Sequence, residues 1–232
     1  MLLHFGSVPT IVVSSAEVAQ EILKTHDSSF SSRPSLPITN ILLYGSKDIA
    51  FSPYGEYWRQ LKSIAVVHLL SGTRVKSFRK VREHEISLMT KKLGDSEGSL
   101  VDMGLMLSSL LIDIICKVSF GRAYDVSKLM DLSKTWLDLL TVFSVGSYIP
   151  WLSWIDRVTG LVGRAEDVAK QMDEFLERVV EDHANMNCDG RKEDGEDLVD
   201  ILLDIHRDET TGFTLHRDSL KSVILVCFLN IL

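Results

Sequence analysis

The chain has 232 residues, of which 45% are hydrophobic and 25% are charged, and its formal net charge is -7. This composition supports a sizeable buried core and excludes a wholly disordered chain. The negative charge argues against a nucleic-acid partner, because binding to phosphates requires clustered Lys and Arg. The cysteines Cys116, Cys188 and Cys227 have neither the spacing of a zinc site nor that of a disulfide framework, so a reducing compartment fits the chain best.

The chain begins with a predicted β-hairpin. Short apolar or β-branched runs occupy residues 2–5 and 10–13, and Gly6 and Pro9 lie between them. The apolar start of the chain is too short for a signal peptide or an anchor, so we expect no membrane span.

A helix and a long loop follow. Ser14 and Ser15 are N-cap candidates for a helix that runs to Lys24. Serines, prolines and a glycine then interrupt residues 25–52, so we expect a loop that holds one short helix at 39–44. Loops of this length in a compact protein are often functional.

The stretch YGEYWRQLKSIAVVHLL, residues 54–70, is the main candidate for a binding site. Helical spacing places Trp58, Arg59 and Lys62 close together, so an indole and two cations could face one flat anionic ligand. An ordinary alternative is a Trp at the edge of the core with solvated cations beside it. The predicted buried stripe of this helix contains Trp58, Leu61, Ala65, His68 and Leu69.

The rest of the chain reads mainly as helices. The helix at 100–120 is apolar on nearly all sides, so we expect it at the centre of a helical core. Residues 144–156 contain Gly, Pro and Trp and predict an aromatic-rich connection rather than a helix. The helix at 217–232 is still apolar at its last residue and has no cap, so we expect an interrupted helix there. The other predicted helices span 74–93, 128–143, 165–180 and 198–205.

Several common site motifs do not occur in the sequence. No spacing of glycines matches a nucleotide-phosphate loop. His84 and Glu85 are followed by Leu88 where a zinc protease has its second His. His183 and Cys188 could share a metal, but no second pair completes four ligands.

Charged residues elsewhere have simple interpretations. The basic run from Arg74 to Arg82 is followed at once by acids, which predicts a solvated helix face. The acids between Glu166 and Asp182 alternate with bases, which predicts ion pairs rather than a catalytic pair of carboxylates.

Four segments, taken in order, resemble a plant cytochrome P450 of the microsomal type. The resemblance implies a mainly α fold: the N-terminal part of the P450 fold, with a short β-hairpin followed by a series of helices. The segments are FSSRP at 30–34, YGEYWRQLKSI at 54–64, FSVGSYIPWLSWID at 143–156 and GEDLVDILLDIHRD at 195–208.

The resemblance also implies a function. Such enzymes bind haem through a cysteine thiolate, receive electrons from an NADPH-cytochrome reductase and insert one atom of dioxygen into a small apolar substrate. Trp58 and Lys62 occupy the positions that hold a haem propionate, with Arg59 beside them, and Lys62 replaces the more common Arg. Full-length relatives lie on the cytosolic face of the endoplasmic reticulum membrane, whereas we expect this chain, without an anchor, in the cytoplasm.

The same resemblance suggests where a substrate lies. The loop from Leu36 to Phe51 corresponds to the substrate-recognition loop over the haem, with Ile49 and Phe51 as contacts. The segment from Thr141 to Tyr148, including Phe143, corresponds to the roof of the pocket. These positions indicate apolar character only and do not identify the substrate.

The sequence departs from the family pattern in ways that affect activity. It lacks the membrane anchor, the dioxygen-handling segment, the Glu-x-x-Arg pair and the loop with the ligand cysteine, and its own cysteines lie elsewhere. We therefore expect residues 1–232 to be a partial P450 domain, truncated at both ends and inactive alone. The alternatives are a truncated or pseudogene product, or a helical interaction module that exposes apolar faces.

Overall fold

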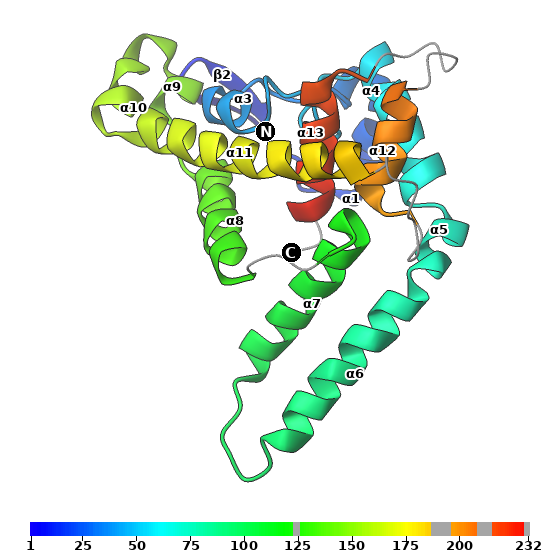
Figure 1. Cartoon of the computed structure of the whole chain (residues 1–232). Helices are drawn as coiled ribbons and strands as arrows, with labels where there is room; N and C mark the ends of the chain where they lie inside the picture. Colours follow the sequence, from blue (N-terminus) through cyan, green and yellow to red (C-terminus); the bar gives the residue numbers. More distant parts are fainter. Residues whose placement is uncertain (123–125, 187–195, 208–214, 230–232) are drawn as a thin grey trace.

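The computed structural model describes residues 1–122, 126–186, 196–207 and 215–229, and Figure 1 shows their arrangement. Helices predominate, and one two-stranded sheet lies at the N-terminus. This confirms the predicted mainly α fold with an initial hairpin. The strands are β1 (Leu2–Phe5) and β2 (Val8–Ile11), and the main helices are α1 (Ala16–Gln20), α3 (Pro37–Leu42), α4 (Glu56–Ile64), α6 (Arg79–Asp95), α7 (Met103–Phe120), α8 (Val126–Thr141), α11 (Leu161–Met186), α12 (Leu198–Arg207) and α13 (Arg217–Leu229).

The second strand begins two residues earlier than predicted. Phe5 pairs with Val8, so the turn consists of Gly6 and Ser7 alone. Pro9 is tolerated inside β2 because each strand of a two-stranded sheet is an edge strand. Gly6 has a φ of 61°, and a Cβ there would overlap the carbonyl of Tyr148, which accepts a hydrogen bond of 2.8 Å from the Ser7 N–H.

The core lies where α11, α13 and α3 meet. The helix α11 crosses the front of the molecule in Figure 1, and α13 and α3 pack against it. Apolar residues at helical spacing bury one face of α11, as predicted, and its acids lie on the opposite side. The buried side chains of this region include Leu42, Leu43, Met172, Leu176, Val179, Leu220 and Ile224.

The helices α6 and α7 form an antiparallel pair that projects from the rest of the molecule in Figure 1. The expectation that the 100–120 helix lies centrally in the core is right only for its C-terminal half. Ile112, Ile115 and Phe120 are buried, whereas Leu105 and Leu107 are 64% and 46% exposed because the N-terminal half extends beyond the core. Within the part of the chain that the structure describes, α7 is the one helix whose length and composition would allow it to cross a membrane.

The connection at 144–156 is more helical than predicted. It contains α9 (Val145–Tyr148), the 3₁₀ turn η3 (Pro150–Leu152) and the start of α10 (Trp154–Val158). Its organiser is the buried carboxylate of Asp156, which accepts hydrogen bonds from the backbone N–H groups of Val145 and Gly146 and from the hydroxyl of Ser144. Local sequence patterns missed α9 because its start is held by Asp156, a residue outside that helix.

Candidate functional site

The helix α4 continues directly into η2 (Ala65–Leu69), a π-helical turn. Leu61, Ala65 and Leu69 are buried, as the sequence predicted, but His68 is exposed. A π turn contains more residues than an α turn, so positions after Ala65 rotate around the helix axis and His68 leaves the buried face. Such turns are often found at functional sites.

An apolar cavity of about 580 Å³ lies beside α4 and η2. Its size falls within the range of roughly 300–1,000 Å³ that is usual for small-molecule sites. Three cationic side chains, Lys62, Arg74 and Arg82, belong to its lining. The remaining lining residues are Ile49, Trp58, Ala65, Val66, Leu69, Leu70, Val75, Phe78, Ile114, Ile115, Val118, Ser119, Leu198, Ile201, Val226 and Cys227.

Trp58 and Lys62 lie together at this cavity. The Trp58 indole Nε1 donates a hydrogen bond of 2.9 Å to the carbonyl of Ile49. The Lys62 Nζ lies 4.8 Å from the centre of the Trp58 ring, a cation–π arrangement between neighbouring turns of α4. The indole is therefore fixed by Ile49, and Lys62 supplies the positive charge beside it.

Arg59 lies elsewhere. Its guanidinium pairs with Glu56 at 3.2 Å and lies 5.9 Å from the centre of the Tyr54 ring. It is exposed and does not contribute to the cavity lining. The structure thus brings Trp58 and Lys62 to one cavity and directs Arg59 away from it.

Arg74 and Arg82 are cavity residues that the sequence analysis treated as part of a solvated face. Arg74 pairs with Glu196 at 3.3 Å, and Arg82 donates a hydrogen bond of 2.9 Å to the carbonyl of Val75. The predicted helix at 74–93 is divided at Phe78, which caps α5 (Gly72–Ser77) and precedes α6, so Arg74 and Arg82 lie on different helices. Local spacing therefore gave no signal that both would reach one cavity.

The three predicted substrate residues have different surroundings. Ile49 lines the cavity, and its carbonyl holds Trp58. Phe51 is partly buried against the core but does not line the cavity. Phe143 is 69% exposed and stacks on Tyr148, with ring centres 5.1 Å apart.

The cavity suits a flat apolar molecule that carries carboxylates, since an apolar surface is combined with cations in its lining. The described cysteines do not suit a thiolate ligand. Cys116 is fully buried, and burial raises the pKa of the Cys227 thiol to about 11, although Cys227 lines the cavity. Cys188 lies outside the described residues.

No metal site is formed by His, Cys, Asp or Glu within the ranges that the structure describes. His183, considered above as a metal ligand with Cys188, is buried instead against Asp197, with 2.9 Å between its Nε2 and the carboxylate. The acids of α11 do form ion pairs: Asp173 and Glu177 pair with Lys221 of α13.

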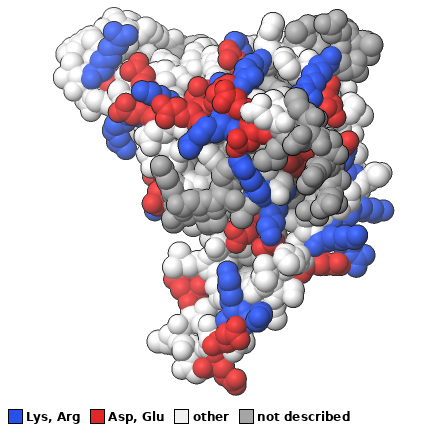
Figure 2. All heavy atoms as spheres, in the orientation of Figure 1, with Lys and Arg blue, Asp and Glu red and all other residues white. Residues whose placement is uncertain are grey.

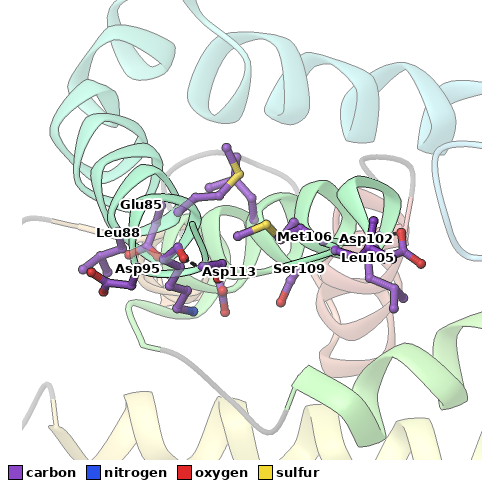
Figure 3. A pocket seen from close by; sticks show the side chains of 14 residues that line it. Glu85, Leu88, Asp95, Asp102, Leu105, Met106, Ser109 and Asp113 are labelled. Carbon is purple, nitrogen blue, oxygen red and sulfur yellow. Dashed lines mark hydrogen bonds between the residues drawn. The ribbon is translucent and has the colours of Figure 1, made fainter. Parts of the chain in front are cut away.

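A second cavity of about 650 Å³ lies between α6 and α7 (Figure 3). Its lining includes the carboxylates of Glu85, Asp95, Asp102 and Asp113. Burial, together with the negative charge of Glu85, raises the pKa of Asp113. The lining contains these four carboxylates and one cation, Lys92, so its formal charge is negative and disfavours an anionic ligand. In the view of Figure 2, by contrast, acidic and basic side chains are mixed over the surface of the molecule.

Comparisons with known proteins identify the family to which the chain is similar. The family model for cytochrome P450 matches residues 1–230. The chain is 58% identical over 228 residues to cytochrome P450 Tp4149 of Tanacetum parthenium, covering 98% of this chain and 45% of that protein. It is 50% identical over 235 residues to cytochrome P450 71A26 of Arabidopsis thaliana (99% and 46% covered) and 49% identical over 230 residues to a 3-beta-hydroxylase of Tanacetum parthenium (99% and 46% covered).

The fold is similar to that of solved structures. A zebra fish cytochrome P450 structure with progesterone matches with a TM-score of 0.73 at 19% sequence identity, and the match covers 98% of this chain and 52% of that one. This likeness concerns the fold. The chain spans about half the length of the curated relatives that it matches.

Proposed function

This chain belongs to the cytochrome P450 family, and we propose on that basis that it supplies the N-terminal half of a haem-thiolate monooxygenase. The proposed reaction inserts one atom of dioxygen into a small apolar substrate. The name of one relative, a 3-beta-hydroxylase, is consistent with a reaction of this class. The proposed electron donor is an NADPH-cytochrome reductase, and the proposed location of the whole protein is the endoplasmic reticulum membrane.

The observation that carries the proposal is the pairing of Trp58 with Lys62 at an apolar cavity. A haem is flat and apolar apart from two propionates, so the cavity lining fits its faces and the Lys62 ammonium fits a propionate. When bound, haem would supply the dioxygen chemistry. The role of the chain is to orient the group, to neutralise its carboxylates and to exclude water from its apolar faces.

Each named residue has a distinct part in this proposal. Lys62 contributes charge as a flexible ammonium rather than the two-pronged contact of an Arg. Trp58 supports Lys62 and presents an indole whose N–H is held by Ile49. Ile49 and Phe51 remain the proposed contacts for an apolar substrate, with Phe143 at its roof. The axial thiolate would come from outside the described residues.

Titration of the 232-residue chain with hemin, followed by absorbance, tests this function. Lys62→Ala is expected to weaken hemin affinity roughly tenfold, the size of one charge-assisted contact, and Lys62→Arg to preserve it. Trp58→Ala should weaken it at least as much. The matched control is Lys170→Ala, which removes an exposed lysine of α11 that does not line the cavity.

Two results would contradict the proposal. One is an affinity that Lys62→Ala and Lys170→Ala reduce equally, because the charge would then act non-specifically. The other is the absence of saturable hemin binding by the folded chain. In the reduced state under carbon monoxide, we expect no thiolate-type band. Such a band would show that our interpretation of the cysteines is wrong.

A second candidate function is that of a helical interaction module. The exposed apolar side chains of α7, Leu105, Leu107 and Leu111, favour it, since large exposed apolar patches mark association surfaces. Self-association that depends on α7, without hemin binding that depends on Lys62, would support this second function over the first.

A further inference from the structure

The segment from Tyr44 to Phe51, which carries Ile49, begins in a strained conformation. Tyr44, Gly45 and Ser46 have φ values of 52°, 73° and 59°. The left-handed region is unfavourable for residues other than glycine, and a run of such residues persists only where surrounding contacts hold it. The start of the segment is held by the contacts of Tyr44 together with hydrogen bonds from the Gly45 N–H and the Ser46 hydroxyl to Asn40.

Tyr44 is held by a partly buried ionic cluster that joins α11 to α13. Its hydroxyl donates a hydrogen bond of 2.6 Å to Asp173. Lys221 pairs with the same carboxylate and lies 3.1 Å from Glu177, and its ammonium is 5.2 Å from the centre of the Tyr44 ring. The Lys221 side chain is only 8% exposed, so its charge requires these acids.

The charges of the cluster reinforce one another. Burial raises the pKa of Asp173, but the hydrogen bonds from Lys221 and Tyr44 outweigh this effect and hold the pKa below its usual value. Arg217 pairs with Glu177 and adds a second cation to the cluster. Asp173 is therefore ionised at neutral pH and is a strong acceptor for the Tyr44 hydroxyl.

The other end of the segment reaches the candidate cofactor site. The carbonyl of Lys47 accepts hydrogen bonds of 2.7 Å from the hydroxyls of Tyr57, on α4, and Ser222, on α13. Two residues later, the carbonyl of Ile49 accepts the hydrogen bond of the Trp58 indole. A continuous set of contacts thus runs from Lys221 through Tyr44 and the segment to Trp58.

We propose that Asp173 and Lys221 are positioning residues: through Tyr44 they place the 44–51 segment so that the Ile49 carbonyl holds the Trp58 indole beside Lys62. The placement of Trp58 can be measured without any cofactor. The effect of Trp58 placement on haem binding rests on the proposed function. The residues on α11 and α13 thereby affect a site that they do not touch.

The test is the hydrogen exchange of the Trp58 indole N–H, followed by nuclear magnetic resonance of the 232-residue chain without cofactor. The resonance is assigned by its loss in Trp58→Phe. Tyr44→Phe, which removes only one hydroxyl, is expected to speed this exchange roughly tenfold, as the loss of one hydrogen bond to a charged group allows. The matched control is Tyr148→Phe, the same change at a residue outside the segment.

Lysine variants separate positioning from general destabilisation. Lys221→Met should speed the exchange of the Trp58 indole, and Lys221→Arg, which retains the cation, should restore slow exchange. If Tyr44→Phe does not fold, the exchange of the Trp58 indole N–H is measured in Asp173→Asn, where it should also be faster. Unchanged exchange and an unchanged indole shift in folded Tyr44→Phe or Asp173→Asn would overturn the proposal, as would an equal change in Tyr148→Phe.

Hemin titration of the same variants distinguishes this proposal from the proposed function. Faster indole exchange in Tyr44→Phe, in a chain that binds no hemin, supports the positioning role and contradicts the haem role. Hemin binding that depends on Lys62, with unchanged indole exchange in Tyr44→Phe, supports the haem role and contradicts the positioning role. If the haem role and the positioning role are both correct, Tyr44→Phe weakens hemin affinity and Tyr148→Phe does not.

Discussion

The neighbours of the buried His183 side chain stabilise its protonated form. Its Nδ1 lies 2.7 Å from the carbonyl of Val179 and its Nε2 lies 2.9 Å from the carboxylate of Asp197. Both partners are acceptors when Asp197 is ionised, and this geometry favours a ring that is protonated at both nitrogens. Burial lowers the pKa of His183, but the hydrogen bond and charge of Asp197, with further contributions from Val179 and Asp200, raise it overall.

Because of the contact between His183 and Asp197, we expect the free energy of unfolding to fall as pH rises. The pKa of His183 is raised in the folded state above the unfolded value of about 6.5, so its stabilisation is complete below that value and is lost as pH rises through the folded pKa. Urea unfolding between pH 5.5 and 9 should therefore show a decline in the free energy of unfolding at the alkaline end. His183→Gln should flatten this decline. An equal decline in His183→Gln would assign the effect to other groups.

The short helix α9 shows how a local element depends on a distant side chain. Its start is held by the Asp156 carboxylate, which accepts the N–H of Gly146 at 2.8 Å. A Cβ at Gly146 would lie 2.8 Å from the Asp156 Oδ2 and 2.9 Å from the Ser153 Cβ. Glycine is required here by close packing and not by its backbone angles.

A pair of glycine substitutions tests this interpretation. Gly146→Ala should destabilise the chain by about 1–3 kcal/mol, because the added methyl group overpacks a buried turn. Gly163→Ala is the control: it lies in α11 with no atom within 4 Å of its Cβ, and alanine there should stabilise by up to about 1 kcal/mol. Urea unfolding of both variants measures the difference. Equal effects would show that the turn has room for a side chain.

At the scale of the whole molecule, the α6–α7 pair is the part that extends beyond the core. It projects from the core in Figure 1, and its apolar side chains Leu105, Leu107 and Leu111 are 64%, 46% and 47% exposed. Exposed apolar side chains of this kind favour association in water, because covering them removes apolar surface from solvent.

The exposed leucines of α7 lead us to expect self-association of the 232-residue chain. Replacing Leu105, Leu107 and Leu111 together by Gln should shift the chain toward the monomer in light scattering at micromolar concentration. Leu23, 73% exposed and distant in sequence, provides the control, and Leu23→Gln should leave the association unchanged. A monomeric wild-type chain, or equal effects of the two changes, would contradict this prediction.

Much of the fold and part of the site follow from local sequence patterns. The apolar spacing of α11, the Ser15 cap of α1 and the helix around Trp58 and Lys62 were predictable, because each depends on residues three or four positions apart along the chain. The π turn that exposes His68 was not, since it breaks the spacing on which the prediction relied.

Contacts between distant residues were decided only by the tertiary structure. No periodicity in the sequence brings the carbonyl of Ile49 to Trp58, Tyr44 to Asp173 or Asp156 to Gly146, and none shows that Arg59 points away while Arg74 lines the cavity. Outside the π turn, the sequence by itself determined which residues of α4 and α11 share a helix face, and it determined which family the chain resembles. Which faces meet, and which stay exposed, depends on long-range packing, because local patterns carry no information about partners far along the chain.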